Sequence, residues 1–520
     1  MSLLKKILIG IAALLGILII ANIGLNIWIE KKLPSIINEE NDSPYYITYK
    51  DIDVSLFSSS IVANGIVVVP KTSLTNTAAK AGFYANISSV QVNQFNAWNL
   101  IFSNKLGARS IRVIKPEVIL YKTKEKVQKD RRQLHEEVVE PFTKIVLVSD
   151  IYLESGDFKV MDAANVKPVM RVSNINANLE GILITDEILE RKIPFEFDKY
   201  AVSYDSLFYR PNAFYDIRTK NFSAKHDSIS ITDIEYIPRL SREAFVKAIP
   251  KEKDLYAIKA ANLLIRDMKW GYRGKDFFFH TNAINLESVH ANIYRPKMPP
   301  DDLSKKPLYN KLLREIPFDL KVDTLIVRNS ILEYEEEKTF EKGAGLLSFR
   351  RFNMYVRNIA SGFRKKKMED VKIHIDCHFM NVSPMEVDWT LNILDKSDGF
   401  NIKGSILNFP ANKLEPFTKP YMNISAEGML DKVYFNFTGN DHISKGDFAI
   451  DYEDLKFTVY RKKDKEKKNK LLSAVVNLFV KKDTKEKVKN AEIEVERIHE
   501  KSFFNFLWRS IAEGLKKILI

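Results

Sequence analysis

The chain has 520 residues, of which 45% are hydrophobic and 11% aromatic. This composition excludes a disordered chain, and the scarcity of glycine and proline, 19 residues each, excludes a collagen-like or low-complexity architecture. The formal net charge is +13, but residues 461–490 alone carry twelve Lys/Arg against four Asp/Glu, a net +8. A charge excess confined to one segment is typical of a patch for anionic lipid head groups or of a solvated loop, and it argues against a nucleic-acid-binding protein.

Residues 7–29 form a run without a charged side chain, ILIGIAALLGILIIANIGLNIWI. A helix of this length rises about 34 Å, which is enough to cross a hydrocarbon core of about 30 Å. Lysine pairs flank the run and Trp28 lies near its end, as is usual at membrane interfaces. A cleaved signal peptide is the alternative, although its apolar run is normally only about 7–15 residues long. The sequence predicts a cytoplasmic tail at 1–6 and a single transmembrane anchor at 7–29.

Beyond the anchor, apolar and polar residues alternate with the period of a β-strand. Two segments resemble each other, FTKIVLVSDIYLESGDFKV at 142–160 and FDLKVDTLIVRNSILEYEE at 318–336. Each reads as a strand, a small polar corner (Ser155–Gly156 or Asn329–Ser330) and a returning strand, and Asn64–Gly65 likewise reads as a turn. Because no strand–helix–strand rhythm appears, we expect antiparallel pairing.

The expected fold is mainly β. One N-terminal transmembrane helix precedes an elongated, curled antiparallel β-sheet with a groove-like face, and a short amphipathic helix ends the chain. The β-rich body is predicted at 30–460, a basic segment with the closing strands at 461–500, and the helix at 501–520. A sheet of so many strands has to twist or curl, and its apolar face needs a cover.

Two sets of apolar residues are candidates for binding. The first, from one face of the middle strands, would line the groove: Ile145, Leu147, Leu325 and Val327. The second follows helical spacing in the C-terminal segment and is expected to form one apolar stripe: Phe504, Leu507, Trp508, Ile511, Leu515 and Ile518. That stripe either caps the open end of the sheet and hides a strand edge, or contacts a membrane surface.

Signals for chemistry are weak. The cluster His374, Cys377 and His378 has the residue types of a metal site, but strand alternation places both histidines on the opposite side from Cys377, the only cysteine. The acidic run at 335–337 reads as a solvated turn. No nucleotide-binding, hydrolase or metalloprotease motif occurs in the sequence. We therefore expect a binding, transport or scaffolding protein without catalytic residues, metal or cofactor.

Three stretches resemble a known family: VSLFSSSIVANGIVVVPK with IRVIKPEVILYK, then KPLYNKLLREIPFDLKVDTLIVRNSILEYEE, then GMLDKVYFNFTGNDHISKGDFAIDYEDLKFTVYRKK. They are similar to AsmA-like proteins of Gram-negative envelopes, which are related to bridge-like lipid-transfer proteins. The resemblance implies an inner-membrane anchor and a periplasmic body. It also implies a groove that binds phospholipid acyl chains, serving transport between inner and outer membranes or envelope homeostasis. The alternative is a structural or assembly factor that binds outer-membrane or envelope proteins through exposed strand edges.

Overall fold

The computed structural model describes most of the chain from Tyr45 onward. The described ranges are 45–55, 57–71, 82–96, 106–122, 146–163, 167–183, 196–461, 464–468 and 489–519, together with Ile19, Ile20, Ile23, Gly24, Ile27, Trp28 and Lys31. Most of the predicted anchor, and the tail at 1–6, lie outside these residues. Among the described residues, no helix has the length and apolar character needed to cross a membrane.

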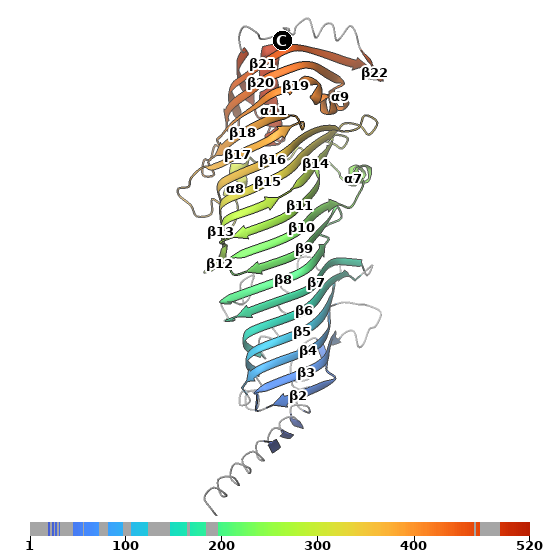
Figure 1. The fold of residues 1–520 in the computed structure, drawn as a ribbon, viewed down its shortest axis with the longest axis vertical. Helices are drawn as coiled ribbons and strands as arrows, with labels where there is room; N and C mark the ends of the chain where they lie inside the picture. Colours follow the sequence, from blue (N-terminus) through green and yellow to red (C-terminus); the bar gives the residue numbers. More distant parts are fainter. Residues whose placement is uncertain are drawn as a thin grey trace, which may run out of the picture. The chain divides into compact units, whose positions relative to one another are not determined.

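The protein is mainly β, with a large mixed sheet and few helices (Figure 1). The chain divides into two compact units. The first contains residues 1–211 and 218–226, and the second contains residues 212–217 and 227–520. Strand β9 (Tyr215–Lys225) is therefore shared between them.

The other strands of the first unit follow one another along the chain. They are β1 (Tyr45–Thr48), β2 (Asp51–Ser55), β3 (Ser60–Pro70), β4 (Gly82–Phe95), β5 (Leu106–Lys122), β6 (Val146–Asp162), β7 (Lys167–Glu180) and β8 (Lys199–Tyr209).

The second unit contains helices as well as strands. Its elements are β10 (Ser228–Pro238), α7 (Arg242–Ala248), β11 (Leu255–Arg266), β12 (Lys269–Arg273), β13 (Asp276–Glu287), β14 (His290–Pro296), α8 (Tyr309–Arg314), β15 (Asp319–Glu337), β16 (Gly345–Ala360), β17 (Val371–Phe379), β18 (Ser383–Leu391), β19 (Phe400–Pro410), η3 (Ala411–Leu414), α9 (Glu415–Met422), β20 (Ile424–Gly439), β21 (Ile443–Arg461), β22 (Asp464–Lys468), β23 (Lys489–Glu496) and α11 (Phe503–Leu519). The expected C-terminal helix is present as α11.

The expectation of a purely antiparallel sheet is wrong. Strand β6 runs parallel to β5, and β15 runs parallel to both β13 and β14. A parallel step requires the chain to return along the whole strand before it pairs again. In the second unit, residues 297–318 make this return with only the six-residue helix α8, so they produce no strand–helix–strand rhythm. The two segments that resemble each other in sequence are the two strands, β6 and β15, that follow parallel steps.

Each polar corner is a kink inside one continuous strand, not a turn between two. Ser155 in β6 and Asn329 in β15 have φ values of 54° and 52°, in the left-handed region. Both backbone N–H groups donate to an asparagine of the next strand at 3.0 Å, Ser155 to Asn176 Oδ1 and Asn329 to Asn353 Oδ1. Gly65 is a third kink, within β3, at φ 62°. Small polar residues and glycine tolerate the left-handed conformation, which is also common in turns. The sequence pattern that predicted a turn therefore marked a special backbone conformation, although the strand continues through it.

Candidate functional site

The first unit has one apolar face. Cross-strand register aligns two apolar rows from β2 to β8: Val54, Ile61, Val92, Ile111, Ile151, Leu179 and Tyr200, and beside them Ile52, Ala63, Val90, Val113, Leu153, Ala177 and Val202. A row on the opposite face is polar: Ser55, Ser60, Asn93, Ser110 and Asp150. Period-2 alternation thus separates apolar from polar residues strand after strand.

This apolar face continues across the kink. Ala63 and Val90 pack against the buried cluster around Ile61 and also against the cluster around Val68. Ile61 and Val68 lie on either side of Gly65 in β3, seven positions apart, where strict alternation would put them on opposite faces. The left-handed residue shifts the alternation by one, so that both arms of the strand present apolar side chains to the same side.

The second unit repeats the arrangement from β10 to β23. Its two apolar rows are Ile229, Ile265, Ile284, Leu325, Val356, Ile373, Trp389, Ile402, Phe437, Gly446 and Ile493, and beside them Ile231, Leu263, Leu286, Val327, Met354, Ile375, Val387, Gly404, Phe435, Phe448 and Ala491. The opposite face carries Thr324, Arg357, Lys372, Thr390, Asn401, Thr438, Lys445 and Glu494.

The solvent exposure of this apolar face changes along the rows. Near the C-terminal end the face is fully buried, since the side chains of Ile402, Phe437 and Phe448 are 3%, 0% and 0% exposed. On β10, β11 and β13 the same rows are only half-buried, at Ile229, Leu263, Ile265, Ile284 and Leu286. A half-buried continuation of a buried apolar face is a surface on which an apolar ligand would remove further area from water.

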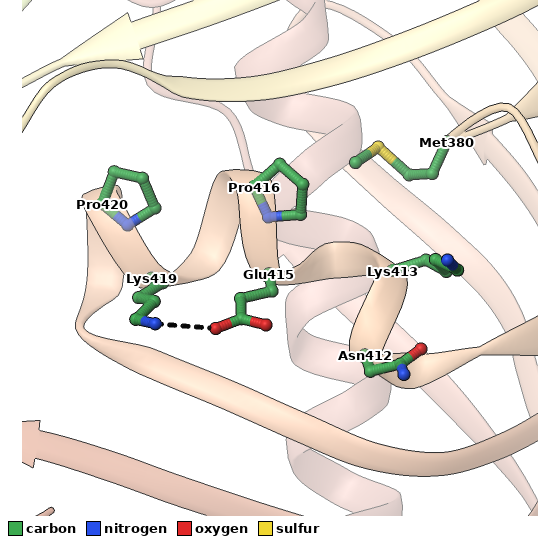
Figure 2. A pocket seen from close by; sticks show the side chains of 7 residues that line it. All are labelled: Met380, Asn412, Lys413, Glu415, Pro416, Lys419 and Pro420. Carbon is green, nitrogen blue, oxygen red and sulfur yellow. Dashed lines mark ion pairs between the residues drawn. The ribbon is translucent and has the colours of Figure 1, made fainter. Parts of the chain in front are cut away.

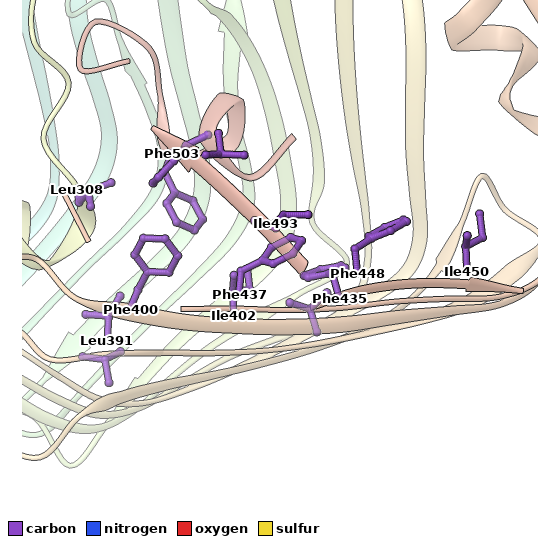
Figure 3. Packing of buried hydrophobic residues seen from close by; sticks show 14 of the residues in the cluster. Leu308, Leu391, Phe400, Ile402, Phe435, Phe437, Phe448, Ile450, Ile493 and Phe503 are labelled. Atoms are coloured by element: carbon purple, nitrogen blue, oxygen red, sulfur yellow. The ribbon is translucent and has the colours of Figure 1, made fainter. Parts of the chain in front are cut away.

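Helix α11 covers the fully buried end. It lies on the side of the strands from which Phe437, Phe448 and Ile493 project (Figure 3). Phe503 stacks on Trp389 with ring centroids 4.5 Å apart and 4° between the ring planes. At Gly514 the helix comes so close that an added Cβ would lie 2.4 Å from Phe448 Cγ.

The stripe predicted on this helix divides between the core and the solvent. Leu507, Ile511, Leu515 and Ile518 pack at the margin of the core, but Phe504 and Trp508 are 61% and 46% exposed. The centre of the contact is instead Phe503, Phe506, Ser510 and Gly514, all buried. The stripe was predicted from the spacing of large apolar residues. Small residues, however, are what allow the helix to approach the sheet most closely.

The same helix occupies part of a strand edge. Arg509 Nη1 donates to the backbone oxygen of Glu496 at 2.6 Å, and Lys517 Nζ donates to that of Glu492 at 2.9 Å. Both carbonyls belong to β23, which pairs with β21. Unpaired strand carbonyls invite pairing with another chain, so these two basic side chains reduce that tendency.

The return segment between β14 and β15 completes the cover. Leu308, 1% exposed, belongs to the same core cluster as Phe437 and Phe503. Asn310 Nδ2 donates to the backbone oxygens of Asn392 and Gly399 at 2.8 and 2.9 Å. The guanidinium of Arg497 bonds Asp441 and the backbone oxygen of Lys306, and burial lowers the pKa of Arg497.

The four groove candidates from the sequence have different outcomes. Leu325 and Val327 lie on the apolar face, in its two rows; Val327 is buried and Leu325 is half-buried against the core. Leu147 lies in β6 at the register position of Gly107. Ile145 lies outside the described residues. Sequence analysis missed Leu263, Ile265 and Ile284, although the same alternation marks them.

The acidic run at 335–337 is not a solvated turn. It ends strand β15, where Glu335 pairs with Arg242 at 2.5 Å and buried Glu337 accepts a hydrogen bond from Tyr294 at 2.5 Å. Desolvation, followed by this bond to Glu337, raises the pKa of Tyr294. Nearby, burial and then Asp254 raise the pKa of Tyr256 to about 12. Every carboxylate here has a partner, which indicates a structural network.

A hollow near α9 lies outside the apolar rows. One open hollow of about 580 Å³ lies beside α9 and is lined by Met380, Asn412, Lys413, Glu415, Pro416, Lys419 and Pro420 (Figure 2). Its carboxylate, Glu415, already pairs with Lys419 at 2.9 Å. Cys377 is buried, whereas His374 bonds Asp388 at 2.9 Å on the other face, and the described chain holds no group of side chains suited to a metal ion.

Comparison with known proteins adds no relative. No protein-family model matches the chain, and no curated protein matches it.

Proposed function

We propose that this protein binds lipid acyl chains on the apolar face of its sheet and contributes to phospholipid transport or envelope homeostasis. In this proposal the uncharged run at 7–29 anchors the chain in the inner membrane of a Gram-negative cell, and the β-rich body lies in the periplasm as a curled, groove-like sheet. The resemblance to AsmA-like proteins supports this placement. The role is one of binding and not of catalysis.

One observation supports the proposal most directly. The apolar rows that are fully buried at the C-terminal end continue, half-buried, over β10, β11 and β13. A row of polar residues runs along the opposite face from Thr324 to Glu494. Acyl chains would cover such a face and leave their head groups in water. The alternative role, assembly of envelope proteins through strand edges, has less support, because α11 occupies two carbonyls of β23.

Two neighbouring leucines of β11 provide a matched test. Leu263 lies in an apolar row between Ile231 and Leu286, whereas Leu264 lies on the opposite face between Ser230 and Asn285. Both are half-buried. A carboxylate beneath an acyl chain costs about 2 kcal/mol or more, which corresponds to a loss of affinity of about thirtyfold.

The experiment compares Leu263→Asp with Leu264→Asp in the full chain, purified in detergent and exchanged into a lipid-free surfactant. Phospholipid that remains bound is quantified by mass spectrometry, and folding is followed by thermal unfolding. We expect Leu263→Asp to lose bound phospholipid and Leu264→Asp to retain it, with similar melting temperatures. Equal lipid content in both variants, or no phospholipid in the wild type, would contradict the proposed function.

A further inference from the structure

Helix α11 has a second apolar surface that stays partly exposed to solvent. Phe504 and Trp508, 61% and 46% exposed, lie one turn apart on the helix. Tyr309 of α8, 37% exposed, extends this surface, with its ring centroid 6.5 Å from that of Phe504. We call Phe504, Trp508 and Tyr309 the aromatic edge.

The aromatic edge touches the core only at its margin, where the rings of Tyr309 and Phe504 lie edge-on to Phe503 with centroids 6.1 and 5.8 Å away. The main contact of the helix with the sheet is made by Phe503, Phe506, Ser510 and Gly514, and each of these is buried. Large aromatic side chains that remain in water beside a satisfied packing face are a cost to the isolated protein. Their exposure therefore points to a partner outside the fold.

The charged residues near the aromatic edge indicate what kind of surface it would bind. The helix carries Arg509, Lys516 and Lys517 against the single acid Glu513, a net charge of +2. The side chain of Lys516 is 68% exposed, and its nearest carboxylate, Glu513, is 3.9 Å away. Exposed Phe and Trp combined with excess positive charge suit the interface of an anionic bilayer.

We infer that the aromatic edge docks on the surface of an anionic lipid membrane, with Phe504 and Trp508 in the interfacial region and Lys516 against the head groups. This membrane contact is separate from the anchor predicted at 7–29. It also does not depend on the proposed binding of acyl chains, because the aromatic edge lies outside the two apolar rows of the sheet.

The test uses the full chain held in nanodiscs of phosphatidylcholine, so that the N-terminal segment is already occupied by lipid. These nanodiscs are mixed with vesicles of phosphatidylcholine, with or without phosphatidylglycerol, and floated on a density gradient. The variants are Phe504→Ser with Trp508→Ser, and separately Lys516→Glu. The matched control is Phe506→Ser, which removes a buried aromatic from the same helix.

We expect the wild type to float with phosphatidylglycerol vesicles, and flotation to fall at least about tenfold in the double variant and with added salt. The double variant should keep the wild-type melting temperature and bound phospholipid, whereas Phe506→Ser should lower the melting temperature. Lys516→Glu should weaken flotation without unfolding the chain. Unchanged flotation of the double variant and of Lys516→Glu would overturn the inference. So would wild-type particles that self-associate through these residues, since the partner would then be a second copy of the chain.

Discussion

The close approach of α11 to the sheet makes Gly514→Ala a sharp test of the packing. In an ordinary helix interior this change stabilises by about 1 kcal/mol, because alanine is the better helix former. Here the new Cβ would lie 2.4, 2.5 and 2.7 Å from Phe448 Cγ, Cβ and Cδ1, atoms at the root of a fully buried side chain. Those atoms cannot swing aside as the end of a flexible chain could.

Overpacking of a core typically costs about 1–3 kcal/mol, and a clash with an immobile ring belongs in the upper half of that range. Subtracting the gain in helix propensity leaves a net destabilisation of about 1–2 kcal/mol. Amide hydrogen exchange within residues 503–519 should then accelerate about 5- to 30-fold in the full chain. Exchange in the first unit should not change.

Two companion variants complete the test. Lys516→Ala, at an exposed position on the same helix, should leave exchange nearly unchanged. Phe448→Leu combined with Gly514→Ala should be less destabilised than the sum of the single changes, because leucine removes part of the ring that meets the new methyl. Slower exchange in Gly514→Ala would refute the reasoning, since it would mean that helix propensity outweighs the contact.

The kinks and the tyrosine network give two further predictions. Asn329→Val forces a β-branched residue into a backbone with φ 52°, and it should lower the free energy of unfolding by about 1–2 kcal/mol. Asn329→Gly should leave that free energy nearly unchanged. Equal effects of the two changes in urea titrations would argue against a left-handed kink. The pKa of Tyr256 is raised to about 12, so the folded state holds its proton more tightly than the unfolded state. Its contribution to stability should be fully present below pH about 10 and be lost between about 10 and 12, and Tyr256→Phe should flatten that part of the stability–pH curve.

Strand alternation and helical periodicity could be predicted from local sequence alone. Leu325 and Val327 were assigned to one face by period-2 alternation, and they lie in adjacent apolar rows of one face. The C-terminal helix was predicted at 501–520 and extends over Phe503–Leu519. The special backbone at Ser155 and Asn329 was also detectable, because small polar residues mark left-handed positions. Each of these features depends on residues within a few positions of one another.

The tertiary structure decided what local sequence does not encode. Parallel steps at β6 and β15 depend on where a strand pairs after a long return, and strand pairing is a contact between distant segments. Whether Ser155 ends a strand or bends it depends on the neighbouring strand that continues past it. The closest approach of α11 to the sheet lies at Gly514, whose small size matters only opposite Phe448. Close packing depends on the complementary shapes of two surfaces, and a local stretch of sequence describes only one of them.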